Sequence, residues 1–308
     1  MRIITSGSRY LDIDGYGGIV AYAELLTKQG IEALAVSTAP FNESITKTVR
    51  SWPVTFETSY SLNSDDTFTL IDVSAPEYFD VFVDADRIDT VIDHHPGREV
   101  YWQEQIGSGA NIELVGAACT QVYEYWKRAG LIDQISSASA RLLMCGILDN
   151  TLNFGAQITT QRDKDAYDDL KQYADLPENW PEVYFGEIQS SIDSDPVTAI
   201  KNDTKDIDEF PSRPEPLRVG QFALWSATDI IANYQLALED AYNIERTEWF
   251  INIISIGERR SYFICKDPAT QKWVADLLGV TFNGNLATAD RLWLRKEIIE
   301  QDIRRSTS

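Results

Sequence analysis

Histidine is nearly absent from this chain of 308 residues, which has only two, His94 and His95. Histidines scattered over a surface would not be expected to fall side by side, so the pair predicts a site that uses neutral imidazole. Both follow Asp93 directly, within the segment Val91–Gly97. Imidazole beside carboxylate is typical of a metal centre or a proton-transfer site.

Cysteine and long apolar runs are also scarce. The three cysteines, Cys119, Cys145 and Cys265, show no C-x-x-C spacing and lie in apolar segments, so we interpret them as buried thiols and not as metal ligands. No apolar run approaches the roughly 18 residues of a membrane-spanning helix, and the N-terminus enters a strand-like segment without a targeting pattern. We therefore expect a cytoplasmic protein that does not bind membranes.

Basic residues are few relative to acidic ones. The chain has 27 Lys and Arg against 48 Asp and Glu, which gives a formal net charge of −21. Proteins that bind nucleic acids normally present a basic face, so the composition argues against a nucleic-acid partner. An anionic substrate would have to be held by metal ions and a few local cations.

The acidic residues include several at the ends of apolar segments: Asp12 and Asp14 after Arg2–Thr5, Asp72 after Phe68–Ile71, and Asp149 after Leu142–Leu148. We interpret these ends as one edge of an open α/β sheet, where such sheets gather their ligand sites. In an extended segment Asp12 and Asp14 could point the same way, and in a turn after the strand they could reach two neighbouring ions. Crowded carboxylates repel one another unless cations are present. Carboxylate with imidazole suits Mn²⁺, Mg²⁺ or Co²⁺.

Helical and strand-like patterns alternate along the chain. Residues 17–29, 120–129 and 163–174 have helical spacing, and 32–37 reads as a strand. This alternation predicts an α/β fold, with a parallel sheet covered by helices on both faces. Small polar residues suggest a linker at 189–195, between a first domain over 1–188 and a smaller α/β domain over 196–308. In the second domain we expect strands at 222–225, 249–255 and 261–265, with helices at 229–242 and 271–278.

Each of these residues has a structural alternative. An aspartate at the end of a strand often caps a helix or stabilises a turn. Taken together, the ordered acids and the only two histidines favour a site. The glycines Gly15, Gly17 and Gly18 could suggest a dinucleotide-binding loop, but they do not form G-x-G-x-x-G after a strand, and Asp12 and Asp14 intrude there.

In this order the motifs resemble those of the DHH phosphoesterases: Asp12-x-Asp14, Asp72, Asp93-His94-His95 and Gly146–Thr151. The chain is most similar to the manganese-dependent (family II) inorganic pyrophosphatases and the related exopolyphosphatases, whose second domain is called DHHA2. The segment Leu114–Thr120 resembles their entry to the helix after the DHH strand. Two further segments resemble their substrate-binding stretches: Asp203–Asp206, which contains Lys205, and Leu294–Glu297, which contains Arg295 and Lys296.

The resemblance implies a DHH catalytic domain, a DHHA2 domain and a reaction. It implies hydrolysis of pyrophosphate or short polyphosphate by a water that bridges two Mn²⁺ ions, with Mg²⁺ or Co²⁺ as other options. Asp72 would bridge the ions, Asp93 would orient an imidazole, and His95 would act as a hydrogen-bond donor or general acid. The remaining implied metal ligands are Asp12 at one ion, and Asp14, His94 and Asp149 at the other. The cations Lys205, Arg295 and Lys296 would neutralise the non-attacked phosphate; their alternative is solvated surface charge.

Two departures from the family pattern leave alternatives open. Ser8 stands where the pyrophosphatases have the first histidine of H-x-N-P-D-x-D, and Leu294 and Glu297 flank Arg295-Lys296 in place of Ser and Lys. One alternative is a DHH phosphodiesterase that acts on nucleotides, although this chain lacks the G-G-G-H signature of those relatives. The other is a non-catalytic member with a weakened metal site. The length of a polyphosphate substrate and the oligomeric state stay open, with a homodimer among the options.

Overall fold

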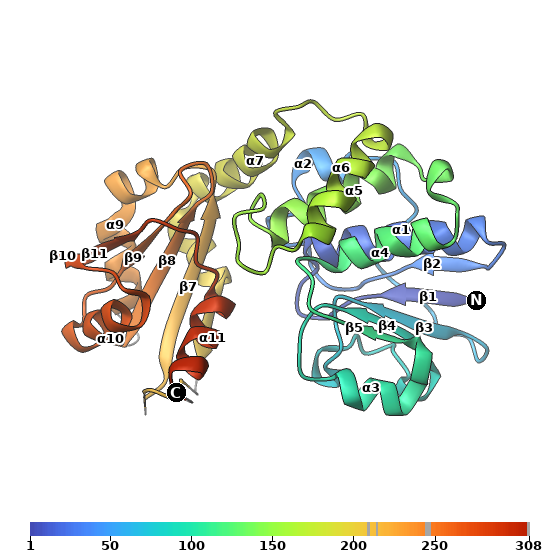
Figure 1. Ribbon diagram of the computed structural model, residues 1–308, viewed down its shortest axis with the longest axis horizontal. Helices are drawn as coiled ribbons and strands as arrows, with labels where there is room; N and C mark the ends of the chain where they lie inside the picture. The colour runs from blue at the N-terminus through green and yellow to red at the C-terminus, as the bar shows by residue number, and fades with distance from the viewer. Residues whose placement is uncertain (208–209, 214, 244–247, 307–308) are drawn as a thin grey trace. The chain divides into compact units, whose positions relative to one another are not determined.

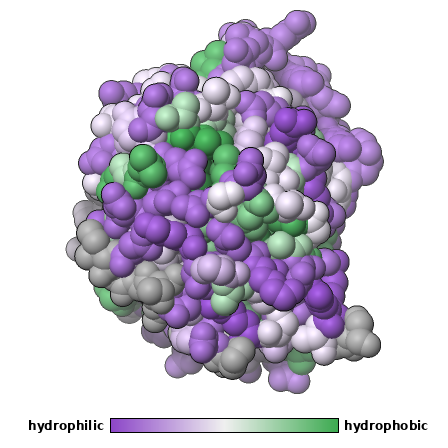
Figure 2. Space-filling view, turned by 90° about the vertical axis from the view of Figure 1, so that its left-hand side faces the viewer, coloured by the Kyte–Doolittle hydropathy of each residue, from purple (hydrophilic) through white to green (hydrophobic). Residues whose placement is uncertain are grey.

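The computed structural model describes residues 1–308 except 208–209, 214, 244–247 and 307–308 (Figure 1). The chain forms two compact units, one of residues 1–154 and 158–180, the other of residues 155–157 and 181–308. Within the described ranges no helix is long and apolar enough to cross a membrane. The face shown in Figure 2 is mostly hydrophilic, with small hydrophobic areas between, as the acidic composition leads one to expect.

The first unit is built on a five-stranded, all-parallel sheet in the order β2-β1-β3-β4-β5. Its strands are β1 (Arg2–Thr5), β2 (Ala33–Ala35), β3 (Thr67–Ile71), β4 (Ile88–Asp93) and β5 (Ala110–Ile112). The central strand β3 is almost entirely buried, which fits its continuous apolar run, because helices cover both faces of a parallel sheet.

The helices of the first unit are α1 (Ile13–Lys28), α2 (Lys47–Arg50), α3 (Glu99–Ile106), α4 (Ala118–Arg128), α5 (Ser137–Asn150) and α6 (Gln161–Ala174). Short 3₁₀ turns lie at Pro76–Tyr78, Ala85–Arg87, Gly107–Gly109 and Ile132–Gln134. In Figure 1, α1, α4, α5 and α6 lie on one side of the sheet and α3 on the other. The predicted fold class is therefore confirmed, and the predicted helices correspond to α1, α4 and α6.

Two glycines of α1 serve close packing. A Cβ atom at Gly18 would lie 2.6 Å from Ile71 Cγ2 on β3, and one at Gly17 would lie 2.8 Å from the carbonyl oxygen of Leu142 on α5. Only glycine lets this helix approach the sheet and α5 so closely. These residues lie inside α1 and form no loop. All three cysteines are buried, as predicted.

The second unit is built on a six-stranded mixed sheet in the order β10-β11-β9-β8-β7-β6. Its strands are β6 (Thr204–Ile207), β7 (Leu217–Leu224), β8 (Trp249–Ser255), β9 (Arg260–Ile264), β10 (Phe282–Asn283) and β11 (Leu286–Ala289). Its helices include α8 (Pro196–Asn202), α9 (Thr228–Asn243), α10 (Pro268–Leu278) and α11 (Arg295–Ser306). Phe250 and Phe263 contribute to its buried core. The strands and helices predicted for this unit correspond to β7, β8, β9, α9 and α10.

The segment suggested as a linker is mostly helical. Helix α7 (Trp180–Ser194) runs through it, because Tyr184, Ile188 and Ile192 recur every four residues and are buried on one side of the helix. The two compact units divide at residues 180 and 181. The domain limits at 188 and 196 stay a prediction.

Candidate metal centre

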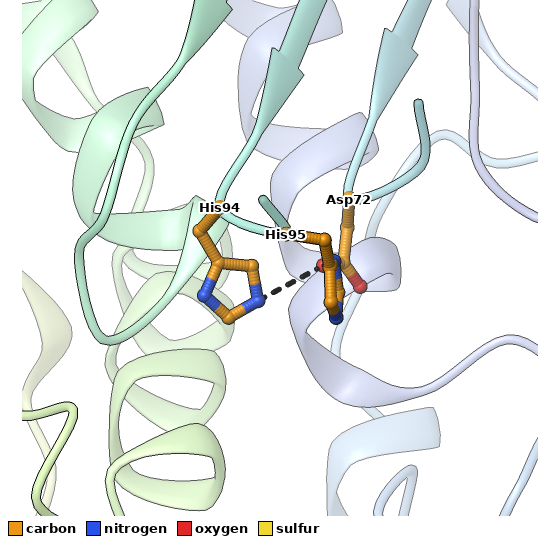
Figure 3. Close-up of side chains that lie close together, drawn as sticks. All are labelled: Asp72, His94 and His95. Carbon is orange, nitrogen blue, oxygen red and sulfur yellow. Dashed lines mark ion pairs between the residues drawn. The ribbon is translucent and has the colours of Figure 1, made fainter. Parts of the chain in front are cut away.

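Three neighbouring strands of the first sheet, β1, β3 and β4, bring their carboxyl ends to one edge. Asp72 follows β3 directly, while His94 and His95 follow β4. Asp72 Oδ1 lies 3.3 Å from His94 Nε2 and 3.7 Å from His95 Nδ1 (Figure 3). The three ligand atoms all lie within 4.8 Å of one another. The edge that the sequence predicted thus brings an acid and both histidines together.

Asp72 has a backbone conformation that is uncommon for a residue other than glycine. Its φ is +62°, and its N–H donates to the carbonyl oxygen of Ile92 at 2.9 Å. Such left-handed conformations cluster at functional sites, where the surrounding structure maintains them. Here the turn at the end of β3 places the Asp72 carboxylate beside the His94 ring (Figure 3).

His94 is held in one orientation by its second ring nitrogen. Nδ1 lies 3.0 Å from the carbonyl oxygen of Val115, so Nδ1 carries the hydrogen and donates it there. In the neutral ring Nε2 then carries the lone pair, and it faces Asp72 and also Asp14, whose Oδ2 lies 3.6 Å away. An imidazole oriented by a backbone carbonyl, with the other nitrogen directed at carboxylates, is the arrangement of metal-binding histidines.

Asp14 is fully buried beneath His94. Its carboxylate accepts the N–H groups of Ala118 and Cys119 at the start of α4, both at 2.8 Å. Burial, and next the negative charge of Asp72, raise the pKa of Asp14 to about 7. Burial and the neighbouring acids make ionisation of this carboxyl group costly. A bound cation would remove that cost, so the arrangement suits a cation site.

Asp12 lies at the N-cap of α1, where its Oδ1 accepts the N–H of Gly15 at 3.0 Å. The expectation that Asp12 and Asp14 share an extended segment was wrong. The helix begins at Ile13 because the Asp12 side chain satisfies one of its first backbone N–H groups. Asp12 nevertheless lies close enough for its charge to raise the pKa of Asp14.

Asp149 lies in the last turn of helix α5, so the apolar run before it is helical, which is one of the two options that the sequence left open. One turn earlier, Gly146 packs against Asp14: a Cβ atom there would lie 3.1 Å from Asp14 Oδ1. Among the described residues, the group whose ligand atoms lie within 4.8 Å does not include Asp12, Asp14 or Asp149. The ligand role of these three residues therefore stays a prediction.

Asp93 holds the chain at the two histidines. It is fully buried, and its Oδ1 accepts the backbone N–H groups of His94 at 2.7 Å and His95 at 3.1 Å. The same oxygen lies 2.9 Å from His95 Nδ1. Burial opposes ionisation of Asp93, but hydrogen bonds from His95 and Ser74 and the charges of the two histidines together outweigh it and lower the pKa of Asp93. The His95 side chain is 54% exposed, so its other ring nitrogen, Nε2, could meet a substrate.

In the second unit the structure joins the two segments that contain the predicted substrate-binding cations. Arg295, at the start of α11, has its Nη2 2.6 Å from Asp203 Oδ1, and its Nη1 donates to the carbonyl oxygens of Asp203 and Val219 at 2.9 and 3.2 Å. The Arg295 side chain is only 10% exposed. Lys205 on β6 is exposed and Lys296 is half-buried. Their predicted role with substrate is untested.

Glu297, the acid that replaces a lysine of the family pattern, is buried and has its own partners. Its Oε2 lies 2.6 Å from Arg291 Nη2, and its Oε1 accepts the N–H of Gln157 at 2.7 Å. The Arg291 guanidinium also lies over the Trp293 ring, 3.6 Å from its centroid. Glu297 therefore has a structural role in this unit and adds negative charge next to Lys296.

Sequence analysis did not identify the backbone groups that orient the side chains of the site. The carbonyl of Val115 and the N–H groups of Ala118 and Cys119 fix His94 and Asp14. Their segment, Leu114–Thr120, had been noticed only as a resemblance. What it does depends on the packing of α4 against α1, which no local pattern contains.

The fold and this edge define an α/β protein with a parallel sheet and an acid–imidazole centre at the carboxyl ends of its strands. Residues 2–147 match the DHH family, N-terminal domain. Residues 2–147 of the chain are thus a DHH-family domain, as the motifs had indicated. The second unit lies outside this match, so its assignment as a DHHA2 domain rests on the resemblance of its short segments.

The chain is also similar to a protein of named function. A Bacillus pumilus protein named a probable manganese-dependent inorganic pyrophosphatase is 27% identical over 185 residues, which cover 59% of this chain and 58% of that protein. The match thus spans less than two thirds of the relative's length.

Solved structures share the fold along nearly the whole chain. A Methanococcus jannaschii protein provisionally assigned as a family II inorganic pyrophosphatase has a TM-score of 0.67 at 16% identity, with 99% of both chains covered. An exopolyphosphatase-related protein from Bacteroides fragilis has a TM-score of 0.50 at 12% identity, with 99% of this chain and 91% of that one covered. At these identities the likeness shows the two-unit α/β fold alone.

Proposed function

We propose that this protein is a divalent-metal-dependent phosphohydrolase that cleaves the phosphoanhydride bonds of inorganic pyrophosphate or short polyphosphates. The observation that carries the proposal is the position of His94 Nε2, 3.3 Å from Asp72 Oδ1 and 3.6 Å from Asp14 Oδ2, inside a DHH-family domain. The name of the Bacillus pumilus relative supports both the substrate class and the use of manganese.

The donor set fits divalent metal ions. Carboxylate oxygens with one imidazole nitrogen suit Mn²⁺, and also Mg²⁺ or Co²⁺, better than metals that prefer thiolate. When bound, two such ions would supply a nucleophilic water at neutral pH and offset the charge of the phosphates. The residues proposed to hold them are Asp12, Asp14, Asp72, His94 and Asp149.

The chain's own groups orient these ligands and handle protons. Val115 fixes the ring of His94, and the start of α4 fixes the carboxylate of Asp14. His95 is anchored through Nδ1 to Asp93, and with its ring doubly protonated it can use Nε2 to donate a hydrogen bond or a proton to the leaving phosphate. In the second unit Lys205, Arg295 and Lys296 are proposed to bind the non-attacked phosphate.

A phosphate-release assay tests the proposal directly. The purified chain, freed of metal and then supplied with Mn²⁺, Mg²⁺ or Co²⁺, is given pyrophosphate, tripolyphosphate and longer chains. We expect release of orthophosphate that requires a divalent ion and is lost in the Asp72→Asn variant. Absence of release from every substrate with every metal would overturn the proposal.

A non-catalytic binding role is the second candidate. Ser8 in place of a metal-binding histidine weakens one expected metal site, and buried Glu297 adds negative charge where the family pattern has a lysine. This candidate predicts that the chain binds phosphates or metal without turnover. The same assay, combined with a measurement of metal content, separates it from the enzyme.

A further inference from the structure

Two arginines of the first unit approach the same short turn, the 3₁₀ turn Pro76–Tyr78. The guanidinium carbon of Arg9 lies 4.7 Å from the centroid of the Tyr78 ring. Arg98 Nη2 lies 3.5 Å from Glu77 Oε1. Adjacent residues of one turn thus contact cations from two loops that are far apart in sequence.

This turn lies at the edge of the sheet that carries the metal centre. Arg9 comes directly after Ser8 in the loop that follows β1, and the turn itself follows Asp72 by four residues. The Ser8 N–H donates to the carbonyl oxygen of Tyr78 at 2.8 Å, which fastens the first loop to the turn.

Arg98 reaches the same turn from the third loop. It follows His95 by three residues and lies at the N-cap of α3. The loops after β1, β3 and β4, which provide Ser8, Asp72 and the two histidines, therefore also provide both arginines and the turn beneath them. Both arginines therefore belong to the loops that carry the candidate metal centre.

The contacts of Arg9 and Arg98 leave both guanidinium groups able to bind an anion. The pair Arg98–Glu77 is long, and its side chains are 42% and 55% exposed, so it contributes little to stability. The guanidinium carbon of Arg9 lies over the Tyr78 ring, and a cation–π contact of this kind uses none of the N–H groups of the guanidinium. The other acid of this loop, Glu99, accepts the N–H of Gly97 at 2.9 Å.

We propose that Arg9 and Arg98 form an arginine clamp that binds a third phosphate group, so that the substrate preferred by this site is tripolyphosphate or a longer chain over pyrophosphate. The inference rests on the proposed function. In pyrophosphate one phosphate is attacked at the metal centre and the other is assigned to Lys205, Arg295 and Lys296. A third phosphate needs further cations, and these are scarce in a chain with a net charge of −21. The planar guanidinium group of arginine matches the geometry of phosphate oxygens.

Kinetics on two substrates test the clamp. In the double variant Arg9→Ala and Arg98→Ala we expect KM for tripolyphosphate to rise roughly tenfold or more, while KM for pyrophosphate changes less than about twofold, because hydrogen bonds to a charged group are lost only for the longer substrate. Glu77→Gln should act in the opposite direction and lower KM for tripolyphosphate, because it removes the acid that competes for Arg98.

Arg128→Ala is the matched control. Arg128 also lies over a tyrosine, 4.2 Å from the Tyr125 ring centroid. It lies at the C-terminal end of α4, whereas Asp14 is bound at the opposite, N-terminal end of that helix. It should leave both KM values unchanged. Equal changes on the two substrates in the double variant, or no change on either, would overturn the clamp and leave the proposed function standing.

A binding measurement covers the case in which the wild type releases no phosphate from either substrate. The proposed function then fails, and calorimetric titration with inorganic tripolyphosphate still tests the clamp. We expect the wild type to bind it roughly tenfold or more tightly than the double variant. Equal affinities would overturn the clamp by itself.

Discussion

His94 Nε2 faces Asp72 Oδ1 at 3.3 Å, and the two residues are held there by unrelated parts of the first unit. The ring of His94 is fixed by its hydrogen bond to Val115, whereas Asp72 is directed by a left-handed backbone at the end of β3. Donor groups held by their own surroundings keep their arrangement without an ion, and such preorganisation favours metal binding.

Replacing Asp72 by asparagine should remove metal with little change in the fold. Asparagine tolerates the left-handed conformation about as well as aspartate, so the backbone at φ +62° is kept while the charge is lost. Because Asp72 is proposed to bridge two ions, both sites should weaken. Elemental analysis of the purified variant measures this, and two ions per chain in Asp72→Asn would contradict the bridging role.

The pKa of Asp14, raised to about 7 in the metal-free protein, predicts a pH dependence. Its unfolded value is about 3.8, so between these values the folded chain binds more protons than the unfolded chain, and Asp14 destabilises the fold increasingly as pH rises. The loss is on the order of a few kcal/mol by pH 8. Divalent metal should offset it, because the ion stabilises the ionised carboxylate.

Thermal unfolding at pH 5.5 and pH 8, with chelator or with Mn²⁺, measures this effect. The rise in Tm on adding Mn²⁺ should be larger at pH 8, and calorimetry should detect protons released on binding below pH 7. Asp14→Asn is the control, since it has no proton to release at this position. A metal-induced Tm rise that is the same at both pH values would count against Asp14 as a ligand.

The sequence was sufficient to locate the edge on which the site lies. The alternation of strands and helices implies a parallel sheet, and all strands of such a sheet present their carboxyl ends at one edge, so Asp72 and the two histidines could be assigned to that edge without a structure. Their order in the chain also indicated the family.

The conformations of Asp12, Asp14 and Asp149 could not be predicted in the same way. An aspartate before an apolar run can lie in the loop after a strand or cap the helix that follows. Asp12 caps helix α1. The run Leu142–Leu148 is equally apolar on all sides, as in a buried strand or a buried helix, and periodicity does not separate the two. The support of His94 by Val115 depends on tertiary contacts alone.

Changing Ser8 to histidine should strengthen the metal site next to Asp12. A hydroxyl group is a far poorer ligand than imidazole, and Ser8 lies in the loop that follows β1, at the edge of the candidate metal centre. The variant should lose metal to a chelator more slowly than the wild type, and its substrate preference should shift toward pyrophosphate. Unchanged metal affinity together with an unchanged ranking of substrates would show that Ser8 does not lie at the metal.

Replacing His95 by glutamine should separate catalysis from metal binding. His95 is half-exposed and is held by Asp93, so it is placed to act on the leaving phosphate. We expect kcat to fall by roughly 10²- to 10⁴-fold with metal content intact. Single-turnover kinetics and elemental analysis of the same preparation measure both. A variant that loses its metal in parallel with its activity would instead make His95 a ligand.

The two cations at the start of α11 should differ in their effects. Arg295 donates hydrogen bonds to Asp203 and to the buried carbonyl of Val219, so Arg295→Ala removes a donor from a buried acceptor and should cost about 1–3 kcal/mol of stability as well as raise KM and lower kcat. Lys296 is half-buried, and Lys296→Ala should raise KM at nearly unchanged Tm. Urea unfolding and pyrophosphate hydrolysis measure the two effects separately.

If both variants hydrolyse pyrophosphate and tripolyphosphate as the wild type does, the likeness of Leu294–Glu297 to the pyrophosphatase stretch is accidental. Substrate recognition must then come from the first unit, where Arg9 and Arg98 are the nearest candidates.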